Sequence, residues 1–198
     1  MRVLLASASP RRREILCRIG LAPDLIVPAD ADETLPADIA PREAVQLLAE
    51  RKALCVLPAA ESDDLLIASD TVVALDGEIL GKPKDRADAY RILRLLSGKI
   101  HEVYTGVCLY YKEQKEVFSV RTAVEFYPLT EQEINAYLDT GEPFDKAGAY
   151  GIQGWGCLLV KRIDGDFFSV MGLPAAETRR AADKLTGNPL FSSHTPAD

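Results

Sequence analysis

Val3-Leu4-Leu5-Ala6-Ser7-Ala8-Ser9-Pro10-Arg11-Arg12-Arg13 is the stretch on which the fold of this chain depends. Its apolar residues 3–6 predict a buried strand, and residues 14–19 predict a helix that Gly20 ends. Ser9 is a good N-cap and Pro10 suits the first helical position. The chain therefore turns from a strand into a helix here, and the free N–H groups of the first helical turn point outward.

Three arginines lie in that first turn, at residues 11–13. The helix dipole disfavours positive charge at this end, so their placement indicates that something negative docks there. Guanidinium groups, free N–H groups and the hydroxyls of Ser7 and Ser9 together fit a polyphosphate. The alternative is an ordinary helix start with solvated arginines. The placement of the charge favours the phosphate site.

Length and charge narrow the class of protein. The 198 residues suffice for one sizeable domain or for two small lobes that share a core. A net charge of -7 argues against nucleic acid as the main partner, although a local basic pocket for a small anion is compatible with it. No apolar run reaches membrane-spanning length, and the N-terminus is unlike a signal peptide.

Cysteine and histidine usage restricts the chemistry. The 4 cysteines are far apart in sequence, which predicts reduced, buried thiols in a cytosolic protein and makes zinc improbable. The 2 histidines, His101 and His194, poorly support a histidine metal centre or a Ser–His–Asp triad. Any metal should therefore be a hard ion on carboxylates.

The remaining pattern alternates strands and helices, with hairpin signals interleaved. Strands are predicted at residues 25–27, 65–68 resuming at 72–75, 78–80, 103–111, 117–127, 158–160 and 167–171. Helices are predicted from Pro41 to Leu57, from Asp85 or Asp88 to Ser97, from Thr130 to Leu138 and from Pro174 to Leu185. Hairpin turns are predicted at 76–77, 112–116 and 164–165. This order predicts an α/β fold with a mixed, twisted sheet and flanking helices.

Asp70 is the most informative single residue. It interrupts an apolar strand run, where a charge is costly unless it is paired or bound to a metal. A structural carboxylate that accepts backbone or arginine hydrogen bonds is the alternative. Because no partner is evident nearby in sequence, a functional carboxylate is favoured.

Other charged residues are weaker candidates. Asp32 or Glu33 could supply an oxygen ligand at the end of a strand, although a solvated loop is the simpler interpretation. Lys52 lies near the apolar face of its helix, so it either extends its ammonium to solvent or reaches the cleft of Arg11. Lys82 is a candidate second cation, although solvated loop lysines are commoner.

Residues 142–156 are unusually rich in glycine. A flexible linker is the bland interpretation, but Phe144, Tyr150, Ile152 and Trp155 are not linker residues. An ordered loop that packs against a ligand is favoured. Gln153 carries both a donor and an acceptor, which suits the reading of a base edge.

Together these residues predict one reaction, provided that they meet in one cleft. Cations would bind a polyphosphate, and carboxylates would hold a divalent ion that neutralises it and lowers the pKa of a water molecule. The reaction so equipped is hydrolysis of a phosphoanhydride.

Five segments carry a resemblance that covers nearly the whole chain. They are Ser7–Arg12, Ser69–Val73, Gly81–Pro83, Lys146–Gly154 and Val170–Pro174. These segments resemble the signature motifs of the Maf family, historically linked to inhibition of septum formation. The resemblance implies a Maf/ITPase-like fold with two lobes around a central nucleotide cleft. It also implies a nucleoside triphosphate pyrophosphatase in which water attacks the α-phosphorus with a divalent metal, Mg or Mn.

The resemblance also assigns roles. Asp70 matches the catalytic proton acceptor, and a metal-ligand role is equally open. The combination of Arg11, Thr71 and Gln153 resembles the base-specificity set of the subfamily acting on dTTP and UTP. Glu33, with Asp70, would bind the metal, and the phosphates would be held by Ser7, Ser9, Arg11, Arg12, Lys52 and Lys82. Ser69 stands where the family often has Ala or Gly.

The expected organisation is a single domain at residues 1–187 with a flexible tail at 188–198. The expected setting is a cytoplasmic homodimer whose partner is a nucleoside triphosphate, with no nucleic acid and no membrane. The competing hypothesis is a nucleotide-binding regulator of septum formation that does not catalyse the reaction. The preferred metal and the physiological nucleotide stay open.

Overall fold

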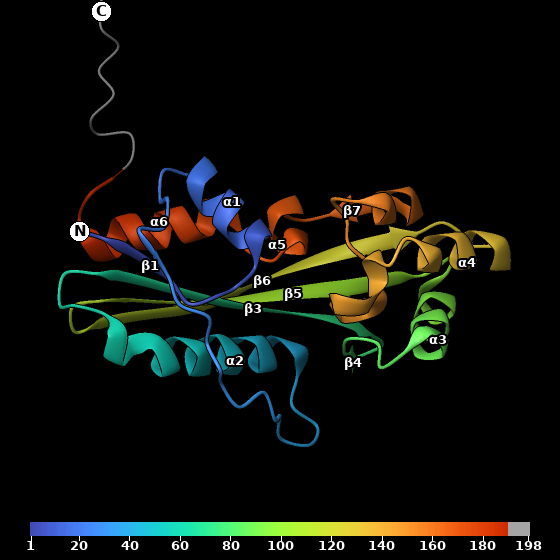
Figure 1. Cartoon of the computed structure of the whole chain (residues 1–198), viewed down its shortest axis with the longest axis horizontal. Helices are drawn as coiled ribbons and strands as arrows, with labels where there is room; N and C mark the ends of the chain where they lie inside the picture. The colour runs from blue at the N-terminus through green and yellow to red at the C-terminus, as the bar shows by residue number, and fades with distance from the viewer. Residues whose placement is uncertain (190–198) are drawn as a thin grey trace, which may run out of the picture.

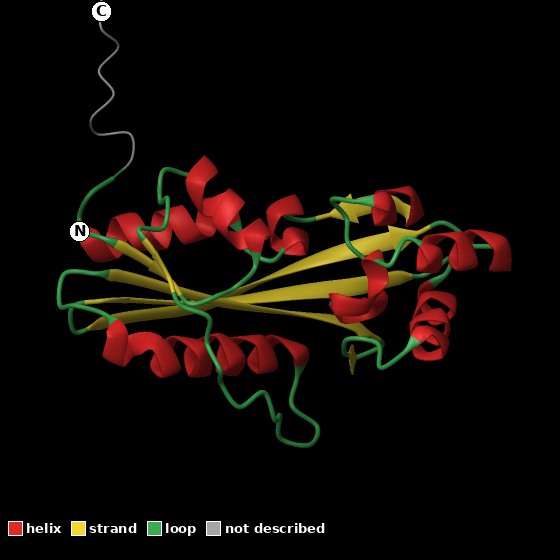
Figure 2. Cartoon of the chain, viewed as in Figure 1, coloured by secondary structure: helices red, strands yellow, loops and turns green. Residues whose placement is uncertain are grey.

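One seven-stranded sheet organises residues 1–189, the part of the chain that the computed structural model describes (Figures 1 and 2). Its strands are β1 (Val3–Leu5), β2 (Leu25–Ile26), β3 (Leu65–Leu75), β4 (Glu78–Leu80), β5 (Ile100–Tyr111), β6 (Gln114–Phe126) and β7 (Val160–Asp164). The order is β2-β1-β3-β5-β6-β7, and β4 pairs with β3. Strand β1 runs parallel to β2 and β3, and the other pairs are antiparallel. The predicted mixed sheet is confirmed.

Helices cover both faces of this sheet. They are α1 (Pro10–Arg18), α2 (Pro41–Val56), α3 (Arg86–Leu96), α4 (Glu131–Asp139), α5 (Phe167–Met171) and α6 (Ala175–Thr186). Helix α2 lies on one face, α1, α5 and α6 lie on the other, and α3 and α4 lie beyond one end of the long strands (Figure 1). Within residues 1–189, no helix is both long and apolar enough to cross a bilayer.

Successive side chains of each strand point to opposite faces of the sheet, so they pack into separate core clusters. Leu4, Leu66 and Ala68 pack toward α2, whereas Leu5 and Ile67 pack toward α1 and α6. A strand buried on both faces reads as one continuous apolar run, which is why β3 is so apolar in sequence. A separate cluster joins α3 and α4 to the other end of the sheet. The molecule therefore has two lobes, and β5 and β6 run through both.

One edge of β3 is open in its middle. Strand β1 pairs with residues 65–67, and β4 pairs with residues 73–75 on the same side. Among residues 1–189, no strand pairs with residues 68–72 on that side, while β5 covers the other side throughout. Strand β3 runs without a break from Leu65 to Leu75, whereas the sequence predicted a strand at 65–68 that resumes only at 72–75. Asp70 therefore lies in the middle of β3. The adjacent strand β1 is the one that ends.

Two predicted elements near the C-terminus are wrong. Residues 167–171 form helix α5, not a strand, because Asp166 caps the helix by accepting from the Ser169 N–H at 3.0 Å. Residues 155–159 form the 3₁₀-helix η4 (Trp155–Leu159), so β7 begins only at Val160. Strand β7 pairs with β6, so the predicted hairpin at residues 164–165 does not form.

Smaller differences concern a turn and the thiols. Two residues, Lys112 and Glu113, join β5 to β6 in place of the predicted five. All four cysteines are free, but only Cys108 is buried, and Cys17, Cys55 and Cys157 are exposed. The predicted tail lies outside the described residues, except for positions 188 and 189.

Candidate active site

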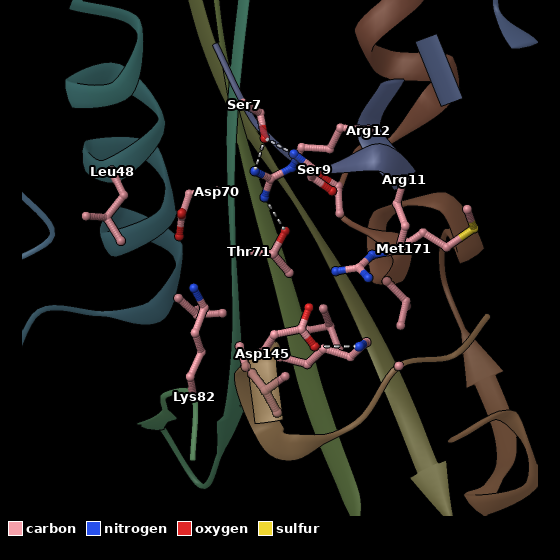
Figure 3. A pocket seen from close by; sticks show the side chains of 18 of the residues that line it. Ser7, Ser9, Arg11, Arg12, Leu48, Asp70, Thr71, Lys82, Asp145 and Met171 are labelled. Atoms are coloured by element: carbon pink, nitrogen blue, oxygen red, sulfur yellow. Dashed lines mark hydrogen bonds and ion pairs between the residues drawn. The ribbon is translucent and has the colours of Figure 1, made fainter. Parts of the chain in front are cut away.

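A cleft of about 1030 Å³ lies at the open edge of β3 (Figure 3). Its lining comes from the segment after β1, α1, the loop that carries Glu33, α2, β3, β4 and the segment after it, β5, the glycine-rich segment and α5. The residues to which the resemblance assigned roles all line it: Ser7, Ser9, Arg11, Arg12, Glu33, Lys52, Asp70, Thr71, Lys82 and Gln153. Of the alternatives Asp32 and Glu33, only Glu33 is among the lining residues, and Asp32 Oδ1 accepts from the Thr34 N–H at 2.9 Å. Segments far apart in sequence thus bring these side chains into one place.

Lys52 of α2 is the partner of Asp70 that sequence alone did not identify. Its ammonium donates to Asp70 Oδ1 and lies 2.7 Å from Glu33 Oε1. The hydrogen bond from Lys52 is the main reason why the pKa of Glu33 is lowered. Two carboxylates from separate segments therefore converge on one cation.

Arg51 fixes the loop that carries Glu33. Its Nη1 donates to the carbonyl oxygens of Asp32 and Thr34, at 3.0 Å and 2.6 Å. These two carbonyls flank Glu33 in sequence, so the backbone on both sides of that carboxylate is attached to α2.

The donor set suits a hard divalent ion. Carboxylate oxygens are the ligands that Mg²⁺ and Mn²⁺ prefer, and Glu33 and Asp70 already meet at one positive charge, the ammonium of Lys52. Within residues 1–189, no group of three or more His, Cys, Asp or Glu side chains is arranged to hold a metal. Further ligands would have to be water or substrate oxygens, as is usual for Mg²⁺.

Arg12 is largely occupied by the protein itself. Its guanidinium donates to the Gly172 carbonyl at 2.9 Å, to Ser7 Oγ at 3.1 Å and, at 3.5 Å, to Thr71 Oγ1. Burial lowers the pKa of Arg12, and the charge of Asp70 opposes that shift. The Ser69 hydroxyl donates to the same Gly172 carbonyl at 2.7 Å, so this serine joins β3 to the end of α5.

Arg11 and Ser9 also face the cleft (Figure 3). Ser9 has the extended backbone of an N-cap, but its side chain makes no capping hydrogen bond to α1. The predicted N-cap position of Ser9 and the predicted start of the helix at Pro10 are thus confirmed, without a side-chain capping bond. The Ser9 N–H instead donates to Ser7 Oγ at 3.2 Å, which shapes the turn from β1 into α1.

The hydroxyl of Thr71 has a fixed polarity. Thr105 donates its only hydroxyl hydrogen to the Ser169 carbonyl at 2.8 Å. The 2.8 Å contact between the two threonine hydroxyls must therefore be donated by Thr71. Arg12 donates to one lone pair of Thr71 Oγ1, so one acceptor lone pair is left for a ligand in the cleft that Thr71 lines. Asp70, on the opposite face of β3, lies toward α2 (Figure 3).

The glycine-rich segment is ordered, as the sequence indicated. It contains η2 (Glu142–Asp145), η3 (Ala147–Ala149) and η4. Asp145 and Lys146 also line the cleft and bond to each other at 2.6 Å. The only signal for this pair in the sequence is its position, since Lys146 is the first residue of the Lys146–Gly154 motif and Asp145 directly precedes it.

The chain is similar in sequence to a known protein family and to several proteins of known name. The family described as Maf-like protein matches residues 2–185. The dTTP/UTP pyrophosphatase of Bacillus velezensis is 52% identical over 180 residues, 91% of this chain and 94% of its own. That of Bacillus pumilus is 48% identical over 188 residues, 95% of this chain and 98% of its own. The Staphylococcus aureus Ham1 protein structure has a TM-score of 0.46 and 18% identity, covering 65% of this chain and 73% of its own.

Proposed function

The chain belongs to the Maf-like protein family, and from this premise we propose that it hydrolyses dTTP and UTP to the monophosphate and pyrophosphate. Water would attack the α-phosphorus, the bond from that phosphorus to the bridging oxygen would break, and pyrophosphate would leave. The relatives named dTTP/UTP pyrophosphatase supply the substrate class.

The observation that carries the proposal is the open edge of β3. Asp70 lies on its α2 face with Lys52 and Glu33, and Thr71 lies on its other face. A nucleotide that crosses this edge would put its phosphates beside the charged groups and its base beside Thr71 and Gln153. Arg11 would complete the base-reading set.

Each charged residue then has a role. Asp70 would accept the proton of the attacking water. Lys52 and Lys82 would hold the phosphates with Arg11, and Ser9 would add its hydroxyl. Ser7 would contribute its hydroxyl hydrogen, and Arg12 the N–H groups that its bonds to Ser7, Thr71 and Gly172 leave free.

Glu33 and Asp70 would hold a divalent cation, Mg or Mn. When bound, such an ion neutralises phosphate charge and lowers the pKa of a coordinated water. The Lys52 ammonium and the metal ion cannot both occupy the space between Glu33 and Asp70. Lys52 would therefore turn its ammonium from the two carboxylates to a phosphate oxygen.

The proposal also covers the domain organisation, the cellular location and the oligomeric state. We place one nucleotide-binding domain at residues 1–187 and the reaction in the cytoplasm, in keeping with four free thiols. The family resemblance favours a homodimer, which light scattering in solution tests. A regulator of septum formation that only binds nucleotide is disfavoured by the enzyme names of the relatives.

Pyrophosphate release from a panel of nucleoside triphosphates, with Mg²⁺ or Mn²⁺, tests the function. We expect fast release from dTTP and UTP and little from ATP or GTP. Asp70→Asn should abolish turnover and retain nucleotide binding, because the amide keeps the shape and loses the basic oxygen. Undiminished turnover in that variant would remove Asp70 from its role, and binding without release by the wild type would support the regulator.

A further inference from the structure

Glu142 lies beside the predicted base-reading loop but belongs to none of the assigned site positions. Its Oε2 accepts from the Trp155 N–H at 2.8 Å, and its Oε1 accepts from the Gly156 N–H at 3.3 Å. The Tyr137 hydroxyl donates to Oε1 at 2.9 Å and accepts from the Gly151 N–H at 3.1 Å. One carboxylate and one phenol therefore hold both ends of residues 151–156.

Two of the glycines in this loop, Gly154 and Gly156, lie close against the same two groups. A Cβ at Gly154 would lie 2.1 Å from Glu142 Oε2, and a Cβ at Gly156 would lie 2.8 Å from the Tyr137 hydroxyl and 2.5 Å from the Gly151 carbonyl. A side chain at Gly154 would displace the carboxylate, and one at Gly156 would displace the Tyr137 hydroxyl or the Gly151 backbone. Glycine at positions 154 and 156 thus allows the loop to lie this close to Glu142 and Tyr137.

Gln153 lies between the attached points. Its neighbour Ile152 is buried in the core under α1 and α6, and Trp155 is bonded to Glu142. Gln153 itself is exposed and lines the cleft. A long amide side chain can read a base only if the backbone that carries it stays in one place.

We propose that Glu142 is a positioning residue that holds the loop at residues 151–156, so that Gln153 meets the nucleobase. The proposal rests on the proposed function for its substrate. Glu142 acts through the loop, because its two oxygens already accept from three protein donors. Its loss should therefore weaken nucleotide binding and base selection more than the attack at phosphorus.

The variant Glu142→Gln tests this at constant shape. Its amide group places N–H donors against N–H or O–H donors of the protein, so at least one of the three hydrogen bonds is lost. Hydrogen bonds to charged groups are strong enough that we expect KM for dTTP to rise about tenfold. The preference for dTTP over dCTP should fall by a similar factor, with kcat within about threefold of wild type.

A second variant, Gly154→Ala, disturbs the contact between the loop and the Glu142 carboxylate from the side of the loop. Gly154→Ala must displace the Glu142 carboxylate, so its kinetic changes should match those of Glu142→Gln. Tyr137→Phe removes only the phenol oxygen and should give a smaller change in the same direction. Glu113→Gln, in the turn between β5 and β6, is the matched control and should behave as wild type.

Trp155, the chain's 1 tryptophan, reports on the loop without any turnover. Its steady-state fluorescence anisotropy should fall in Glu142→Gln and Gly154→Ala, because its backbone is no longer attached. It should stay unchanged in Glu113→Gln. This readout also separates the two proposals, because it applies even if the wild type hydrolyses no nucleotide.

Three outcomes would overturn the proposal. One is unchanged KM and unchanged base preference in a folded Glu142→Gln protein. Another is unchanged Trp155 anisotropy in that variant, whether or not the wild type is active. If Glu142→Gln does not fold, unchanged KM and preference in Gly154→Ala and Tyr137→Phe would have the same force.

Discussion

Asp70 and Thr71 are neighbours in sequence and serve opposite faces of β3. Asp70 is paired with Lys52 from α2, whereas Thr71 bonds to Thr105 of β5 and accepts from Arg12 of α1. Successive residues of a strand always point to opposite faces. Both can serve one cleft only because β1 ends beside them and leaves the edge open.

Because the Thr71 hydroxyl donates its hydrogen to Thr105, it can only accept a hydrogen bond from a ligand in the cleft. Lone pairs on Thr71 repel a phosphate oxygen and accept from an N–H or O–H group. Thymine and uracil present an N3–H donor, whereas N3 of cytosine is an acceptor. The arrangement of Thr71, Thr105 and the Ser169 carbonyl thus suits the bases that the relatives are named for.

Thr105→Val should therefore weaken base selection. The valine keeps the shape and removes the hydroxyl, which frees the Thr71 hydrogen to point into the cleft. We expect the ratio of kcat/KM for dTTP over dCTP to fall about fivefold to tenfold. Thr105→Ser keeps the hydroxyl and should keep the ratio. An unchanged ratio in Thr105→Val would separate Thr71 from base recognition.

Among the elements, β5 carries a buried histidine that is not part of the cleft. His101 lies between the rings of Phe126 and Tyr150, with centroids 4.8 Å and 5.4 Å away. Its Nε2 meets the Tyr150 hydroxyl at 2.8 Å, and its Nδ1 has no hydrogen-bond partner among residues 1–189. Burial lowers the pKa of His101 to about 4.

This histidine should make the fold acid-sensitive. Below the ordinary histidine pKa of about 6.5 the unfolded chain binds a proton that the folded protein refuses until about pH 4. Stability therefore falls as pH drops through this window, by about 3 kcal/mol in total. Urea unfolding of wild type and His101→Phe at pH 7, 5.5 and 4 measures it. Between pH 7 and pH 4 the free energy of unfolding should fall less in His101→Phe than in wild type. An equal fall in both proteins would show that His101 is not the cause.

Elements with a local signal were predictable. The capping box of α4 forms as its sequence indicates, since Thr130 Oγ1 accepts from the Glu133 N–H and Glu133 accepts from the Thr130 N–H. Helix α5 was missed because Phe167 to Met171 has strand-like composition, and its helix depends on the Asp166 cap. Tertiary context overrides propensity in so short a segment.

The site was predictable in its residue types and not in its contacts. The unusual position of Asp70 inside an apolar run marked it from sequence. Its pairing with Lys52 and the bonds of Arg12 to Gly172 and Thr71 join segments far apart in the chain, and the bond from the Trp155 N–H to Glu142 spans 13 residues. No local pattern encodes such pairs, because strand order and helix placement decide them.

At the scale of the whole molecule, the cleft draws on both lobes. Helices α1 and α2 supply Arg11 and Lys52 from one lobe, and the segments around β4 and η3 supply Lys82 and Lys146 from the other. The net charge of -7 is thus compatible with a local gathering of cations. A local gathering of cations can attract a small polyphosphate even when the net charge of the chain is negative.

Hydrolysis of dTTP in ¹⁸O-labelled water tests the central claim, which is attack of water at the α-phosphorus in this cleft. Mass spectrometry of the products locates the label. We predict one labelled oxygen in dTMP and none in the pyrophosphate. Label in the pyrophosphate, or release of orthophosphate with dTDP, would place the attack on another phosphorus and contradict the account.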